Sequence, residues 1–235
     1  MSVNAQKTIL ITGANRGIGY ALTEAYLKKG YRVIAAVRDV AKAPKLDGLI
    51  VVKIDSASTT DPKEAVEQLQ SQGIAHIDII VANAGISSHY KAVKDIQLDA
   101  FQEHHIVNVQ GPLLLFQAFY PLLKEGDKFI VISSLVGAQG IEHYPNMTAY
   151  SSTKATINFI SRSIHFEEPH LTSFTINPGW LDTDMGEFGA KSSGLKKAPQ
   201  KLVDTLPGIV DLIDVSTRED HSGYMWSYDG TKAPF

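Results

Sequence analysis

Tyr150 and Lys154 are the residues in this sequence whose types and spacing most directly suggest chemistry. They stand four positions apart in a segment, residues 148–168, that we expect to be helical, so both side chains would lie on one face of the same turn. A phenol has an ordinary pKa of about 10, and a neighbouring ammonium group favours the phenolate and lowers that pKa. Such a pair can act as a general acid and base at an alcohol or a carbonyl. The same spacing is also common between ordinary neighbours on a helix surface.

A glycine-rich segment near the amino terminus predicts a nucleotide site. It follows residues 8–11, an apolar run typical of a buried parallel strand, and it precedes a helical pattern over residues 16–29. Gly13, Gly17 and Gly19 would let backbone N–H groups approach a pyrophosphate, and the helix N-terminus supplies positive potential there. The alternative is a plain strand-to-helix turn with incidental glycines, and three glycines directly after a strand make it the weaker interpretation.

The next strand, residues 32–38, bears on the type of cofactor. In dinucleotide folds an acidic residue near its end holds the ribose hydroxyl of NAD, whereas an arginine accommodates the 2′-phosphate of NADP. This strand ends in Val37 and Arg38, and Arg16 in the glycine loop could reach the same phosphate. Asp39 stands beside them and argues the other way. The arginines favour NADPH as the cofactor.

Strands and helices alternate along the whole chain. Strands are expected at residues 8–11, 32–38, 49–54, 77–81, 127–132, 171–177 and 223–228, and helices at 16–29, 61–72, 91–125, 148–168 and 202–215. Pro112 predicts a kink or break near residues 108–111. Residues 185–199 lack clear periodicity and are interpreted as a mobile substrate flap.

This alternation predicts the α/β class. We expect residues 1–235 to form a single-domain, Rossmann-type, doubly wound parallel sheet of about seven strands with helices on both faces. In such sheets ligands bind beyond the carboxyl ends of the strands. Six residues lie just past predicted strand ends and would line one crevice: Gly13, Arg38, Asp55, Asn83, Ser134 and Pro178.

Composition excludes several other classes of protein. A net charge of −3 gives no electrostatic case for a nucleic-acid partner, and the absence of cysteine excludes disulfides and thiolate metal sites. No apolar run approaches the ~20 residues that a membrane span needs, and residues 1–7 show no apolar signal region. His104 and His105 are adjacent and would point different ways on a helix, so no metal is assigned. We expect a soluble, cytoplasmic protein.

Taken together, these motifs resemble the short-chain dehydrogenase/reductase family over nearly the full length of the chain. The residues that carry the resemblance are residues 12–19, Asn83, Ala84, Gly85, Asn108, Ser134, Tyr150, Lys154, Pro178, Gly179 and Thr183. Ala82 stands where the family usually has the first of two asparagines. Residues 150–155 and 177–185 are similar to small fungal ketoreductases that reduce aromatic polyketides such as norsolorinic acid.

The resemblance implies a role for each of these residues. Tyr150 would be the proton donor, Lys154 would lower its pKa and hold the nicotinamide ribose, Ser134 would polarise the substrate carbonyl, and Asn108 would hold a water that resupplies protons. Asp55 would contact the adenine, Asn83 would support the loop beside it, and Thr183 would bind the carboxamide. The implied cofactor-binding residues are Gly13, Asn15, Arg16, Gly17, Ile18, Gly19, Arg38, Asp55, Ser56, Asn83, Ala84, Gly85, Tyr150, Lys154, Pro178, Gly179 and Thr183.

Some of these assignments have structural alternatives. Asn108 could mark a helix break without a relay, Ser133 could replace Ser134 as the active hydroxyl, Asp55 could cap a turn, and Thr183 could cap a helix of the flap. The long loop between Ser134 and Tyr150 would reshape the substrate mouth. Candidate substrate contacts are Tyr144, Trp180 and Met185, although Trp180 could equally pack the flap.

The expected function is NADPH-dependent reduction of a ketone or aldehyde, flat or apolar, to an alcohol. The alternatives are an isomerase, dehydratase or cyclase that uses bound NADP(H), and a non-catalytic NADP-binding sensor. The expected partner is a small carbonyl compound rather than a membrane or nucleic acid. A homodimer or homotetramer is possible, and a monomer is not excluded. Residues 224–235, an aromatic tail, would cover the chain's own site or pack on a neighbour.

Overall fold

One eight-stranded sheet forms the centre of the computed structural model, which describes residues 6–142 and 144–234. The strand order is β3-β2-β1-β4-β5-β6-β7-β8; the first seven strands pair in parallel, and β8 pairs antiparallel with β7. The strands are β1 Thr8–Thr12, β2 Arg32–Val37, β3 Ile50–Lys53, β4 Ile79–Ala82, β5 Lys128–Ile132, β6 Thr172–Asn177, β7 Met225–Ser227 and β8 Lys232–Ala233. The predicted α/β doubly wound sheet is confirmed. The additional strand, β8, has two residues, too few to produce an alternating pattern.

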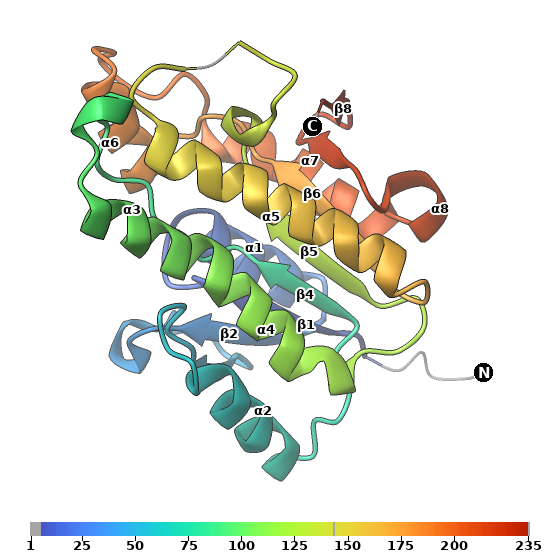
Figure 1. Ribbon diagram of the computed structural model, residues 1–235. Helices are drawn as coiled ribbons and strands as arrows, with labels where there is room; N and C mark the ends of the chain where they lie inside the picture. The colour runs from blue at the N-terminus through green and yellow to red at the C-terminus, as the bar shows by residue number, and fades with distance from the viewer. Residues whose placement is uncertain (1–5, 143, 235) are drawn as a thin grey trace.

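Helices cover both faces of this sheet, as Figure 1 shows. The helices are α1 Gly17–Lys28, α2 Asp61–Ser71, α3 Leu98–His105, α4 Gly111–Phe119, α5 Thr148–Glu167, α6 Asp184–Ser192, α7 Leu202–Val215 and α8 Arg218–His221. One apolar core lies between the sheet and α2, α4 and α5, and a second lies between the sheet and α1 and α7. Because both faces are covered, the central strands β1 and β4 are buried at every position.

The predicted break near residues 108–111 is present as a π-helical segment, Ile106–Gln110, between α3 and α4. Pro112 follows in the first turn of α4. Proline has no N–H to donate, and its ring would clash with the carbonyl four residues earlier, which here belongs to Asn108. The wider π turn relieves that conflict, and the side chain of Asn108 within it is buried and bonded to Ile86 and Thr153.

Residues 185–199, interpreted from the sequence as a mobile flap, contain most of a helix that the sequence did not predict. Residues Asp184–Ser192 form α6, and Thr183 caps it by accepting a hydrogen bond from the Gly186 N–H at 3.3 Å. The helix had no clear apolar pattern because part of its packing surface is made by glycine. Mobility of this segment stays a prediction.

Among the helices of the described residues, none combines the length and the apolar character that crossing a membrane requires.

Candidate active site

The glycine loop joins β1 to α1 at the carboxyl edge of the sheet. Gly13 has a φ of 66°, which favours glycine, and a Cβ on Gly19 would lie 2.3 Å from the Gly13 carbonyl oxygen. The N-terminus of α1 has no side-chain cap and no acidic residue in its first turn. Its N–H groups and dipole therefore suit an anionic ligand, and the loop fits the diphosphate of a dinucleotide. Asn15 is exposed on this loop, and Gly17 and Ile18 are partly buried.

The segment after β4 is fastened to this loop. The Asn83 and Ala84 N–H groups both donate to Thr12 Oγ1 at 3.0 Å, and Asn83 Nδ2 donates to the Thr12 carbonyl oxygen at 2.8 Å. Gly85 follows and lies against the Asn108 side chain. The structure therefore brings the two predicted cofactor segments together, and Asn83 joins them through its bonds to Thr12.

The two arginines of the cofactor prediction have different surroundings. Arg38 is exposed directly after β2. Arg16 is also exposed, but its Nη1 lies 3.0 Å from Asp184 Oδ2 at the start of α6. An exposed ion pair of this kind contributes little to stability, so a phosphate could compete for Arg16. Sequence spacing gave no sign of the Asp184 contact, because the two residues are far apart in the chain.

Asp55 and Ser56 lie at the end of β3 on the same edge. Asp55 Oδ1 accepts the Ala57 N–H at 3.0 Å, so the side chain caps the turn after its strand, which was the structural alternative. This bond leaves the rest of the partly buried carboxylate at the loop surface. Ser56 packs against Gly111 of α4, where an added Cβ would lie 2.7 Å from the Ser56 Cβ. Contact of Asp55 with an adenine stays a prediction.

The side chains of Tyr150 and Lys154 are neighbours on α5, as their spacing predicts. Lys154 Nζ is 5.5 Å from the centre of the Tyr150 ring and donates to the Ile132 carbonyl oxygen at 2.8 Å. Burial lowers the pKa of Lys154 to about 8. Burial also raises the pKa of Tyr150, with Tyr90 adding to the rise and a hydrogen bond with Ser134 opposing it. This direction is opposite to the lowering expected from Lys154: desolvation of the phenolate is the largest cause of the shift, and the hydrogen bond with Ser134 is what opposes it.

The structure distinguishes the two serines after β5. Ser133 is buried, and its hydroxyl donates to Asn158 Oδ1 at 2.6 Å. Ser134 is partly buried and hydrogen-bonds with Tyr150, and its Oγ accepts the Val136 N–H at 3.4 Å. The hydroxyl beside Tyr150 is therefore that of Ser134.

Asn108 connects three segments around the site. Its Oδ1 accepts the Ile86 N–H at 2.8 Å, and its Nδ2 donates to the Ile86 carbonyl oxygen at 2.9 Å and to Thr153 Oγ1 at 3.1 Å. The amide thus ties the π segment to the loop after β4 and to α5. These bonds give Asn108 a structural role, and a proton relay through it stays a prediction.

The segment after β6 lies beside the glycine loop. Pro178 is buried and Gly179 partly buried, and the Thr183 methyl group lies 3.5 Å from where a Gly17 Cβ would be. Thr183 therefore stands beside the glycine loop while also capping α6. Trp180 Nε1 donates to the Gly186 carbonyl oxygen at 2.9 Å, so its indole packs against α6, as the flap alternative supposed.

The two remaining substrate candidates, Met185 and Tyr144, differ in burial. Met185 is partly buried in the first turn of α6, and Tyr144 is exposed. In the tail, the described part folds on its own chain as β7 and β8, and the Tyr228 hydroxyl accepts a hydrogen bond from Gln200 Nε2 at 2.9 Å. Phe235 lies outside the described residues. Phe159 and Phe166 of α5 are largely exposed. The oligomeric state stays a prediction.

Two positioning residues were missed in the sequence. Asn177 Oδ1 accepts the Leu135 N–H at 3.2 Å, which ties the turn after Ser134 to the end of β6. Gln200 Oε1 accepts the Trp180 N–H at 2.6 Å and so holds the base of α6. A signal for Asn177 was available, because it immediately precedes Pro178 and Gly179 at a strand end. Gln200 had no such signal, since it bonds a residue 20 positions earlier in the chain.

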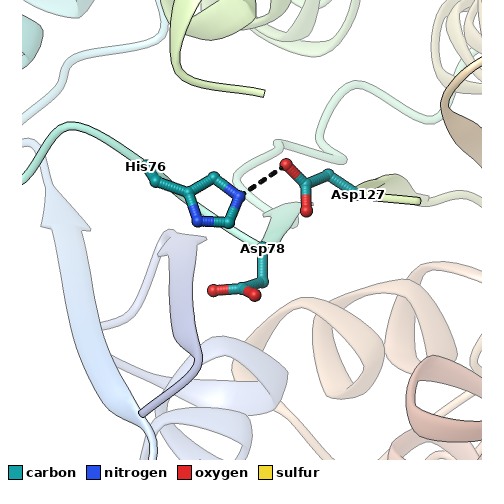
Figure 2. A group of neighbouring side chains, drawn as sticks. All are labelled: His76, Asp78 and Asp127. Atoms are coloured by element: carbon teal, nitrogen blue, oxygen red, sulfur yellow. Dashed lines mark hydrogen bonds and ion pairs between the residues drawn. The ribbon is translucent and has the colours of Figure 1, made fainter. Parts of the chain in front are cut away.

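A group with metal-like spacing lies at the other edge of the sheet. Figure 2 shows His76 facing Asp127, with Asp78 nearby; their ligand atoms lie within 4.8 Å of one another. His76 Nε2 is 2.8 Å from Asp127 Oδ2, and Asp78 Oδ2 accepts the Thr8 N–H at 2.7 Å. These side chains join the starts of β1, β4 and β5, far from Tyr150. The group is not part of the site, and the expectation that the protein holds no metal is untested.

Comparisons with known proteins agree with this geometry. A family profile described as "short chain dehydrogenase" matches residues 7–192. Norsolorinic acid ketoreductase nor1 of Dothistroma septosporum is 41% identical over 97% of this chain and 92% of its own length. Norsolorinic acid ketoreductase of Aspergillus parasiticus is 37% identical over 96% of this chain and 90% of its own length. The solved structure of NADPH-bound carbonyl reductase from chicken fatty liver has a TM-score of 0.83 at 24% identity and covers 98% of this chain and 99% of its own; this likeness concerns the fold.

Proposed function

Because the chain belongs to the short-chain dehydrogenase family and is an oxidoreductase, we propose that it is an NADPH-dependent ketoreductase with Tyr150 as proton donor. One observation carries the proposal: Tyr150, Lys154 and Ser134 meet at the carboxyl edge of the sheet, where the glycine loop opens. Ligands of doubly wound sheets bind at this edge. The cofactor, when bound, supplies the hydride.

The protein's own groups would supply position and the proton. The raised pKa of Tyr150 keeps the phenol protonated at neutral pH, which is the form that can donate to a carbonyl oxygen. Ser134 shares the hydrogen bond at this hydroxyl and would hold the same oxygen, stabilising charge that develops on it. Lys154, held by the Ile132 carbonyl, would bind the nicotinamide ribose and restore the Tyr150 proton.

The substrate we propose is a flat aromatic ketone. The two fungal relatives described above are named for reduction of norsolorinic acid, and the match with each covers at least 90% of both chains. Two aromatic side chains also lie near one another here: Tyr90 in the loop after β4, which raises the pKa of Tyr150, and Trp180, which lies beside the same glycine of α6 as Tyr90. A flat ring system would stack on such side chains.

The reaction is tested by following NADPH or NADH absorbance while the pure protein is offered flat aromatic, simple aromatic and aliphatic ketones. We expect oxidation of NADPH and formation of the matching alcohol. Product formed without net NADPH oxidation would favour the isomerase, dehydratase or cyclase alternative. Steady turnover of any ketone would exclude the sensor.

The choice of NADPH is tested with Arg38→Ala, because Arg38 is exposed directly after β2 and is the residue proposed to bind the 2′-phosphate. A hydrogen bond to a charged group contributes about 1.5–3 kcal/mol, so the Kd for NADPH should rise about 10–100-fold and that for NADH less than about threefold. Arg32→Ala is the matched control, since Arg32 is an exposed arginine at the opposite end of the same strand. Equal losses for both cofactors would contradict the assignment.

A further inference from the structure

Helix α6 touches Tyr90, a residue of the loop between β4 and α3. The Phe188 and Tyr90 rings have centroids 5.8 Å apart at an interplanar angle of 46°. A Cβ on Gly189 would lie 3.0 Å from the Tyr90 hydroxyl and 3.7 Å from Trp180 Cζ2. Tyr90 and Trp180 therefore meet the same glycine of α6, although they come from distant parts of the sequence. In Figure 1, α6 lies at the same end of the molecule as the segment that leads into α3.

Tyr90 belongs to a short loop that hydrogen bonds link to Asn108 and to α5. Its hydroxyl lies 2.7 Å from Ser87 Oγ, and the same short loop is clamped at Ile86 by both ends of the Asn108 amide. Asn108 in turn bonds Thr153, which sits between Tyr150 and Lys154 on α5. Partial burial raises the pKa of Tyr90, so this phenol is neutral at physiological pH. The ring is thus fixed relative to Tyr150 by a short series of hydrogen bonds.

Phe188 presents an aromatic ring with room on one side. Its side chain is 50% exposed, although it packs on Tyr90 on the other side. A flat ligand can cover the exposed part of such a ring, and aromatic pairs in offset or edge-to-face arrangements gain affinity beyond the area they bury.

We propose that Tyr90 and Phe188 form a substrate-selecting aromatic pair that admits flat aromatic ketones to Tyr150 in preference to puckered or aliphatic ones. The inference rests on the proposed ketoreductase function and names residues that decide its specificity. Tyr90 is the fixed member, and Phe188 is the member carried by α6. Neither takes part in proton transfer, so their removal should act on binding of the flat substrate and leave the chemical step in place.

The test uses Tyr90→Leu and Phe188→Leu, which remove an aromatic ring and keep an apolar side chain. Phe166→Leu is the matched control, because Phe166 is 67% exposed on α5 and has no part in the site. The probes are 2-acetylnaphthalene, a flat fused-ring ketone, and cyclohexyl methyl ketone, whose ring is puckered. For 2-acetylnaphthalene we expect KM to rise about five- to tenfold in each variant, with kcat changed less than about twofold. For cyclohexyl methyl ketone kcat/KM should change less than about twofold.

A binding measurement separates failure of this inference from failure of the proposed function. In protein saturated with NADP⁺, where no reduction occurs, the Kd of 2-acetylnaphthalene should rise by the same factor as KM in both variants and stay constant in Phe166→Leu. Equal losses for the two ketones, or no change for either, would overturn the aromatic pair. If wild-type protein reduced no ketone, the proposed function would fail, while the titration would still decide whether the pair binds flat rings.

Discussion

Two tyrosine–lysine groups lie at opposite edges of the sheet, and burial acts on both in the same way. At the carboxyl edge are Tyr150 and Lys154; at the amino edge are Tyr26 and Lys128. Burial raises the pKa of each tyrosine and lowers the pKa of each lysine to about 8. Judged by pKa alone, the two groups are equally good candidates for chemistry.

The hydrogen-bond partners of the two tyrosine–lysine groups differ. The Tyr26 hydroxyl donates to Asp214 Oδ1 at 3.0 Å, and Lys128 Nζ donates to the carbonyl oxygens of Ile213 and Asp214 at 2.8 and 3.1 Å. The amino-edge group therefore joins α1, β5 and the end of α7. Tyr150, by contrast, keeps a partly exposed side chain and shares its hydroxyl with Ser134 beside the glycine loop. A perturbed pKa marks a catalytic group only where a ligand can reach it.

The largest expected effect is that of Tyr150→Phe. Loss of a general acid should lower kcat about 10²–10⁴-fold, and the Kd of NADPH should change less than about threefold. Tyr26→Phe should leave kcat unchanged and lower the free energy of unfolding by about 1–3 kcal/mol, because it removes a hydrogen bond to a carboxylate. Steady-state kinetics and urea unfolding measure the two quantities. Substantial turnover by Tyr150→Phe would refute the assignment of the proton donor.

Substitution of Lys154 should lower activity and substitution of Lys128 should lower stability, with a smaller loss of activity than Tyr150→Phe causes. Lys154→Met should lower kcat/KM about 10²-fold, because Tyr150 loses its partner and the ribose loses a donor. Lys128→Met should change kcat/KM less than about threefold, yet lower the free energy of unfolding by about 1–3 kcal/mol, since carbonyls at the end of α7 lose their donor. A comparable loss of activity in both variants would mean that the two edges are not functionally distinct.

The smallest effect is a pH dependence. The lowered pKa of Lys154 means that its ammonium form is lost as pH rises through about 8, so kcat/KM for reduction should fall there. Lys128→Met should keep that inflection, although the pKa of Lys128 is also about 8 in the wild-type protein. A flat pH profile from 6 to 10 would refute the dependence on Lys154. Loss of the inflection only in Lys128→Met would place the titrating group at the amino edge instead.

The lowered pKa of Lys128 also makes the free energy of unfolding depend on pH. Between pH about 8 and the ordinary lysine pKa of about 10.4, the unfolded chain holds a proton that the folded chain has released. The cost of keeping the Lys128 ammonium group charged in the folded chain, relative to its neutral form, is therefore complete below that range and disappears as pH rises through it. Relative to Lys128→Met, the wild-type protein should gain stability over this interval.

Much of the fold and of the site could be predicted because the signals are local. Apolar runs, the glycine spacing after β1 and the position of Pro112 each act through backbone geometry within a few residues. They were sufficient for the sheet, the glycine loop and the break at Asn108. Helix α6 escaped prediction because glycine leaves no apolar period in the sequence where it packs.

By itself the sequence determined which residue types stand at the carboxyl edge: Tyr150 and Lys154 on one helix face, and Ser134 and Arg38 each at the end of a strand. Only the tertiary structure decided which of them point together. It turned Ser133 toward Asn158 and Ser134 toward Tyr150, paired Arg16 with Asp184, and brought Tyr90 against Phe188. These contacts join segments far apart in the chain, and they form only when helices dock on a finished sheet, so no local pattern records them.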